Sequence, residues 1–153
     1  MGLDMHLIGK RYIWEFDRDD VELIDKISSC FPEIGDNKAR AVEVEFMYWR
    51  KANAIHHWFV ENVQQGQDDC SEHQVLEQDL VTLRDVCQRV MDDSDNAEKY
   101  LPTQGGFFFG NTNYDEYYFD EVRRTLDWLN TVLFVNKFDT KLQRWTFYYQ
   151  SSW

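Results

Sequence analysis

One stretch in the first half of the chain changes its hydrophobic period, and this change restricts the folds open to the protein. Its first part alternates apolar residues with carboxylates over residues 42–48, which predicts a strand with one apolar face. From Tyr48 onward apolar residues recur every three or four positions, which predicts a helix with one buried side. The buried side of that helix consists of Ala52, Ile55, Phe59 and Val63. A strand followed at once by an amphipathic helix favours a fold in which helices pack on a sheet.

The same two patterns recur along the rest of the chain. Alternation in residues 3–8 predicts a first strand, and the β-prone segment 144–153 predicts a last strand that returns beside it. Candidate capping boxes begin at Asp19, Ser71 and Asn113 and indicate helix starts. Helical spacing predicts three further buried stripes: Leu23, Ile24 and Ile27; Leu76, Leu80, Leu83, Cys87 and Val90; Phe119, Val122, Leu126, Leu129 and Leu133. The sequence therefore predicts an α+β fold, with about four helices packed on a small, mostly antiparallel sheet.

Length and composition predict one domain in a reducing compartment. The 153 residues, 43% of them apolar, suffice for a single compact domain over 1–153. Three cysteines at long spacings argue against a disulfide framework and are typical of cytosolic proteins. The N-terminus lacks the pattern of a signal peptide, and no apolar run is long enough to span a membrane. We therefore expect a cytoplasmic protein that makes no contact with a membrane.

The formal net charge of −12 restricts the partners of the protein. Such a charge disfavours general binding to nucleic acid, because a phosphate-binding surface would have to overcome the field of the whole protein. A partner protein with a basic surface is favoured instead, since opposite fields steer association. The alternative is that acidity only keeps a small protein soluble.

Residues of the predicted 48–64 helix are the first candidates for ligand binding. His56 points toward the apolar stripe, where it is either a core-edge histidine or a ligand-binding group. Trp58 lies away from the stripe, either packed under another element or available to stack on a planar ligand such as a nucleobase. Arg50 could then meet a phosphate.

A second set of candidates surrounds the glycine-rich turn in 101–118. Gln104, Tyr114 and Asp115 supply amide, hydroxyl and carboxylate groups suited to ligand recognition, although Asp115 could equally be a helix cap. Several potential metal ligands crowd residues 68–73, but a complete donor set for zinc or calcium is missing. The sequence also has no nucleophile motif such as G-x-S-x-G. We therefore expect no metal and no cofactor.

Several sequence blocks resemble a family of small bacterial and phage proteins that begin MGLDM. The blocks are WRKANAIHHWFVENVQ at 49–64, DDC at 68–70, LPTQGGFFFG at 101–110 and YDEYYF at 114–119. The resemblance implies an accessory protein of bacteria or phages, with a role in phage–host conflict such as counter-defence or host takeover. It implies no catalytic residues.

Two functional hypotheses follow. The first is a non-enzymatic acidic binding protein that inhibits or sequesters a host component. The second is a protein that binds a small ligand or nucleotide in a pocket formed by Arg50, His56, Trp58, Gln104, Tyr114 and Asp115. A hydrolase is a weaker third reading, because 28 acidic residues always offer carboxylate pairs. The oligomeric state is left open.

Overall fold

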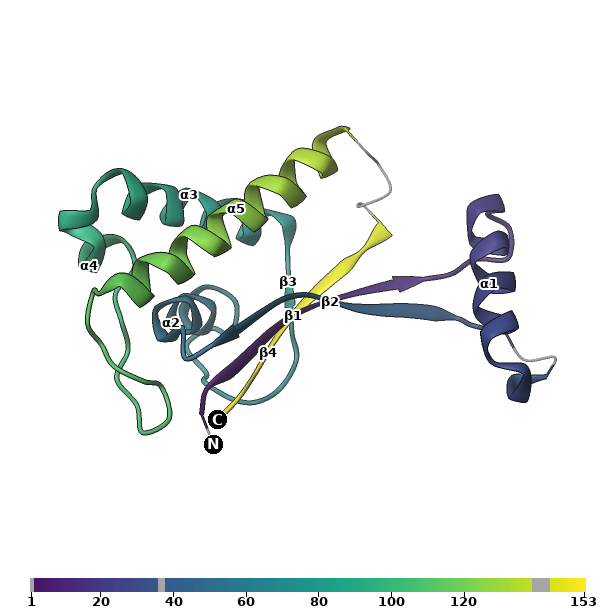
Figure 1. Cartoon of the computed structure of the whole chain (residues 1–153), viewed down its shortest axis with the longest axis horizontal. Coiled ribbons are helices and arrows are strands. Elements are labelled where there is room, and N and C mark those ends of the chain that lie inside the picture. The colour runs from purple at the N-terminus through teal and green to yellow at the C-terminus, as the bar shows by residue number, and fades with distance from the viewer. Residues whose placement is uncertain (1, 36–37, 139–143) are drawn as a thin grey trace.

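The computed structural model describes residues 2–35, 38–138 and 144–153, which form the predicted α+β fold (Figure 1). Four antiparallel strands make one sheet in the order β2-β1-β4-β3. The strands are β1 (Asp4–Tyr12), β2 (Ala41–Arg50), β3 (His73–Val75) and β4 (Thr146–Ser152). The helices are α1 (Arg18–Cys30), α2 (Asn53–Asn62), α3 (Glu77–Asp92), α4 (Ala97–Tyr100) and α5 (Glu116–Phe138), with short 3₁₀ turns at Pro32–Ile34 and Ser94–Asn96.

The core lies between one face of the sheet and helices α2, α3 and α5. Leu3, just before β1, and Met5 and Leu7 within it are fully buried in the core, whereas the residues between them are partly exposed. The predicted last strand is confirmed, because β4 pairs with β1 along its whole length. Helix α2 is buried on most of its circumference, and Phe59 stacks on Tyr149 with ring centroids 4.0 Å apart. Within the described residues, no helix combines the length and the apolar character needed to cross a membrane.

A β-bulge explains why the helix predicted from Tyr48 starts later than expected. The strand continues to Arg50 and α2 begins only at Asn53, so the predicted start is wrong. The register between β1 and β2 shifts so that Phe46 has no partner on β1. Phe46 and Met47 then both face the core side of the sheet, while Tyr48 is exposed and hydrogen-bonds Asp4 on the other face. The extra residue interrupts the alternation of apolar residues within one continuous strand. In the sequence this interruption looks like the change from a strand to a helix.

Three predicted helix caps are also wrong, and one strand and one helix are missing from the prediction. Asp17, not Asp19, caps α1 by accepting from the backbone amides of residues 19 and 20. The box predicted at Ser71 precedes β3, and α3 is capped by Asp79, whose carboxylate accepts from the amide of Leu76. Asp115 caps α5 in place of Asn113, since its carboxylate accepts from the amide of Tyr118. Helix α4, at Ala97–Tyr100, was not predicted from the sequence.

Strands β1 and β2 continue beyond the part of the sheet that the other helices cover, and α1 lies at their far end (Figure 1). We call the far ends of both strands together with residues 13–35 the arm. Ile13 and Ile24 are buried within the arm and lie outside the main core. The arm therefore has apolar packing of its own.

Gly9 marks the place where the arm leaves the core. A Cβ atom at this position would lie 2.3 Å from a ring carbon of Phe46 and 3.1 Å from the Trp145 ring. We expect Gly9→Ala to lower the free energy of unfolding by about 1–3 kcal/mol, as overpacking of a filled core does. Chemical denaturation measures this effect. Gly105→Ala is the matched control, because the nearest atom to its Cβ would be an ordinary 3.8 Å away; equal stability of the two variants would contradict the prediction.

Candidate functional site

The six side chains predicted to bind a ligand do not meet around one cavity. His56 is fully buried in the core, and Trp58 lines a groove between α2, α3 and α4. Asp115 lines a different cavity at the start of α2. The remaining three residues make other contacts. The backbone amide of Gln104 donates to Asn53 Oδ1, and the Tyr114 hydroxyl accepts from the backbone amide of Thr103. The backbone carbonyl of Arg50 accepts from the Tyr117 hydroxyl. Binding by any one of them stays a prediction, but a pocket shared by all six is not formed.

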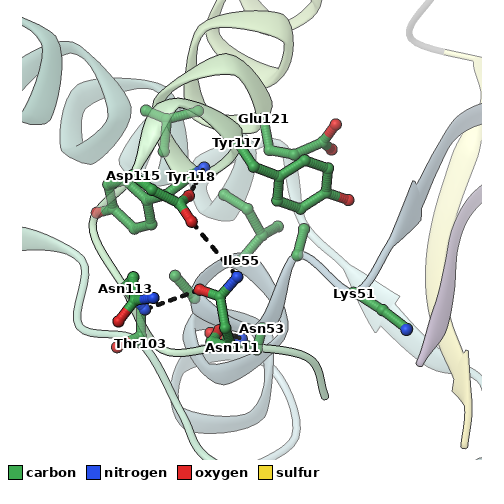
Figure 2. A pocket seen from close by; sticks show the side chains of 13 residues that line it. Lys51, Asn53, Ile55, Thr103, Asn111, Asn113, Asp115, Tyr117, Tyr118 and Glu121 are labelled. Carbon is green, nitrogen blue, oxygen red and sulfur yellow. Dashed lines mark hydrogen bonds between the residues drawn. The ribbon is translucent and has the colours of Figure 1, made fainter. Parts of the chain in front are cut away.

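The cavity at the start of α2 is too small for a metabolite. Its free volume is about 20 Å³, which is room for roughly one water molecule. Figure 2 shows that the Asn111 side chain reaches across it, with Nδ2 3.4 Å from Asp115 Oδ2 and Oδ1 accepting from the Asn113 amide at 2.9 Å. These contacts close the space rather than leave it open for a ligand.

Asn53 organises the glycine-rich loop, a role that the sequence analysis did not assign. Its buried side-chain amide donates to the carbonyls of Phe109 at 3.0 Å and Asn111 at 2.8 Å. Its Oδ1 accepts from the backbone amide of Gln104 at 3.2 Å. The loop that resembled a recognition element is therefore fixed to the N-terminus of α2 by one amide side chain.

His56 forms a buried polar contact across the core. Its Nδ1 lies 2.7 Å from the hydroxyl of Tyr149, and its Nε2 lies 3.2 Å from Asp68 Oδ1, without the alignment of a hydrogen bond. Burial lowers the pKa of His56, and the attraction of Asp68 offsets this only in part. Burial likewise raises the pKa of Tyr149 well above its ordinary value. Because neither His56 nor Tyr149 is exposed, the arrangement joins α2 to β4 and offers no group to a substrate.

His73, which follows the acidic residues 68 and 69, forms a surface contact with Asp69. His73 Nε2 lies 2.8 Å from Asp69 Oδ1, and this hydrogen bond lowers the pKa of the Asp69 carboxyl. Cys70 is exposed. Within the described residues, no three His, Cys, Asp or Glu side chains are grouped so that they could hold a metal ion.

The most exposed apolar surface of the described chain lies on the arm. Tyr12, Trp14 and Phe16 are 66%, 64% and 99% exposed, and we call these three residues the aromatic tip. Together with Asp17 and Arg144 they line an open hollow of about 590 Å³. The sequence contained a signal for this surface that was not used, because Tyr12 and Trp14 flank the buried Ile13 in an extended segment and therefore share its outward side. Phe16 follows in the turn that begins at Trp14.

A buried carboxylate fixes the segment that carries the aromatic tip. Asp20 is fully buried, and its Oδ1 accepts from Arg11 while its Oδ2 accepts from the backbone amide of Trp14 at 3.1 Å. Arg144 adds a second cation, 3.7 Å from Asp20 and 2.7 Å from Asp17. The hydrogen bond from Arg144 lowers the pKa of the Asp17 carboxyl and raises that of the guanidinium. The tip is thus held in place by ionic contacts beneath it.

Comparison of the chain with protein families, curated proteins and solved structures finds no match. No residue role can therefore be transferred from a relative. The choice of a candidate functional surface depends on the geometry, which singles out the aromatic tip.

Proposed function

We propose that this is a non-enzymatic binding protein that docks on a partner protein through the aromatic tip. The observation that carries the proposal is that Tyr12, Trp14 and Phe16 are exposed although a buried ion pair fixes the backbone that carries them. Exposed aromatic clusters on a rigid base are typical of interaction surfaces, where Trp and Tyr supply much of the binding energy. Aromatic residues that are exposed only because a flexible segment does not pack have no fixed backbone beneath them.

The charge distribution favours a partner that is basic around an apolar cleft. Residues 10–41, which include the arm, carry eight acidic residues and six basic ones, Lys10, Arg11, Arg18, Lys26, Lys38 and Arg40. The segment therefore has a net charge of −2, and −10 of the total of −12 belongs to the body. A basic rim on the partner would be attracted to that body while the cleft receives the tip. Among the described residues that line the hollow, Arg144 is the one cation, and it is engaged by Asp17, which disfavours a phosphate ligand there.

The resemblance to small bacterial and phage proteins extends the proposal to the identity of the partner. An acidic accessory protein of this kind would bind a host protein and inhibit or sequester it. The buried His56 is closed to solvent, so it does not support the competing hypothesis of a catalytic histidine.

The test uses a photo-crosslinking residue placed at Phe16 in the full chain and exposed to host lysate. We expect one partner to be crosslinked at low salt, and a combined Trp14→Ala and Phe16→Ala variant to bind that purified partner about 30-fold more weakly or worse, as loss of a hot-spot aromatic predicts. Phe107→Ala is the matched control, because Phe107 is 94% exposed on the loop at the other end of the protein. Equal affinity of the tip variant and the Phe107 variant would overturn the proposal.

A further inference from the structure

A groove at the opposite end of the protein from the arm lies between α2, α3 and α4. Its free volume is about 310 Å³, which is at the lower end of the range for small-molecule sites. The apolar part of its lining consists of Trp58, Val86, Leu101 and Pro102. Figure 1 shows α2 and α4 on the side of the sheet remote from α1, so the groove and the aromatic tip are separate surfaces.

Two polar side chains in the lining have no partner among the described residues. The Nδ1 atom of His57 is shielded from solvent and makes no hydrogen bond. Glu61 follows one helical turn later on α2, exposed and without an ion pair. By contrast, Asn62 already donates to the carbonyl of Trp58, and the Tyr100 hydroxyl donates to Asp93 at 2.9 Å. A buried nitrogen without a partner is costly, and a ligand that supplies a hydrogen bond would remove that cost.

The charge of the lining determines the class of ligand. Glu61 is a carboxylate, and no lysine or arginine is among the described residues that line the groove. A phosphate-bearing ligand such as a nucleotide would meet repulsion from Glu61 and from the net charge of −12. A cation would be attracted, and its N–H groups could donate to Glu61 and to His57 Nδ1.

We infer that this groove binds an organic cation, an ammonium or guanidinium group on an apolar stem, with Glu61 and His57 as its polar contacts. The stem lies against Trp58, Val86 and Pro102, and the cationic head is at Glu61 on the exposed side. The same chemistry is offered by a free amine and by a lysine or arginine side chain of another protein. This inference does not depend on the aromatic tip.

The test is an NMR titration of the full chain with n-pentylamine, with pentan-1-ol as the neutral probe of equal size and N-acetyl-lysine amide as the side-chain probe. We expect the amine to shift the resonances of groove residues and to bind about tenfold more tightly than the alcohol, as a charge-assisted hydrogen bond predicts. Binding of the lysine amide as well would indicate a side-chain ligand, and its failure to bind would indicate a free amine.

Two variants decide whether the proposed contacts are responsible. Glu61→Gln should weaken amine binding about tenfold, and His57→Leu should weaken it too. Glu98→Gln is the matched control, an exposed carboxylate on α4 that does not line the groove. Absence of groove shifts with the amine, or equal affinity of the Glu61 and Glu98 variants with their folds intact, would overturn the inference. The tip variant should bind the amine normally, so failure of the proposed function leaves this result unaffected.

Discussion

Replacement of Asp20 by asparagine should unfold the arm while the rest of the protein stays folded. The substitution keeps the size of the side chain but removes the charge that faces Arg11, a side chain only 16% exposed. Removal of one partner of a buried ion pair leaves the other charge uncompensated and typically costs about 3–5 kcal/mol. The Arg11 guanidinium already has one buried nitrogen, Nε, without a partner, so few other contacts can compensate. The stability of the arm should fall by roughly that amount.

Hydrogen exchange measured residue by residue distinguishes this local loss from a global one. Amides of α1 and of residues 12–17 should lose protection, whereas those of the core helices α3 and α5 should keep it. Asp25→Asn is the matched control, because Asp25 lies on the exposed side of the same helix. Unchanged protection of the arm in the Asp20 variant, or equal loss in both variants, would show that the ion pair does not hold the tip.

The variant also tests the link between structure and binding. If the aromatic tip binds only when its backbone is fixed, Asp20→Asn should lower the affinity for the partner, although all three aromatic side chains are still present. A partner that binds the Asp20 variant as tightly as the native protein would show that prior ordering of the tip contributes nothing to affinity.

Helices whose apolar residues recur at helical spacing over several turns were predictable from the sequence. Most residues of the stripes predicted for α3 and α5 are buried as expected, including Leu83, Cys87 and Leu129. Leu76, which was predicted to belong to the first stripe, precedes α3 and is exposed. The pairing of the last strand with the first was also predicted correctly, because β-branched and aromatic residues at 146–149 have no helical period. Such patterns are local, so they can be recognised without knowledge of the tertiary structure.

Features that depend on pairing between distant segments were not predictable. The Phe46 ring at the bulge occupies space that a side chain at Gly9 on the neighbouring strand would fill, and no pattern within 42–50 indicates this contact. Strand β3 is three residues long, and among the described strands it pairs with β4 alone. The candidate site was missed for the same reason, since the role of Asp20 depends on Arg11 and Arg144, which are far apart in the sequence.

His56 provides the second large expected effect, a loss of stability in mild acid. The folded protein lowers the pKa of His56 because burial disfavours the imidazolium, whereas in the unfolded chain the pKa is near the ordinary value of 6.5. The unfolded state therefore binds this proton more readily, and stability falls as the pH drops below about 6.5. The loss approaches at most about 1.4 kcal/mol per pH unit, and it ends once the pH is below the folded pKa.

Chemical denaturation at pH 7.5, 6.5 and 5.5 measures this loss. His56→Gln, which removes the titrating group, should be less stable at pH 7.5, since the Tyr149 hydroxyl loses its partner at 2.7 Å, but should show a flatter pH dependence. His57→Gln is the matched control from the adjacent position. The Asp69 carboxyl, whose pKa is lowered by His73, contributes stability that is lost only below about its ordinary value of 3.8, outside this window. If the native protein were equally stable at pH 7.5 and 5.5, or if His56→Gln kept the native slope, the buried imidazole would not be the group that destabilises the fold in acid.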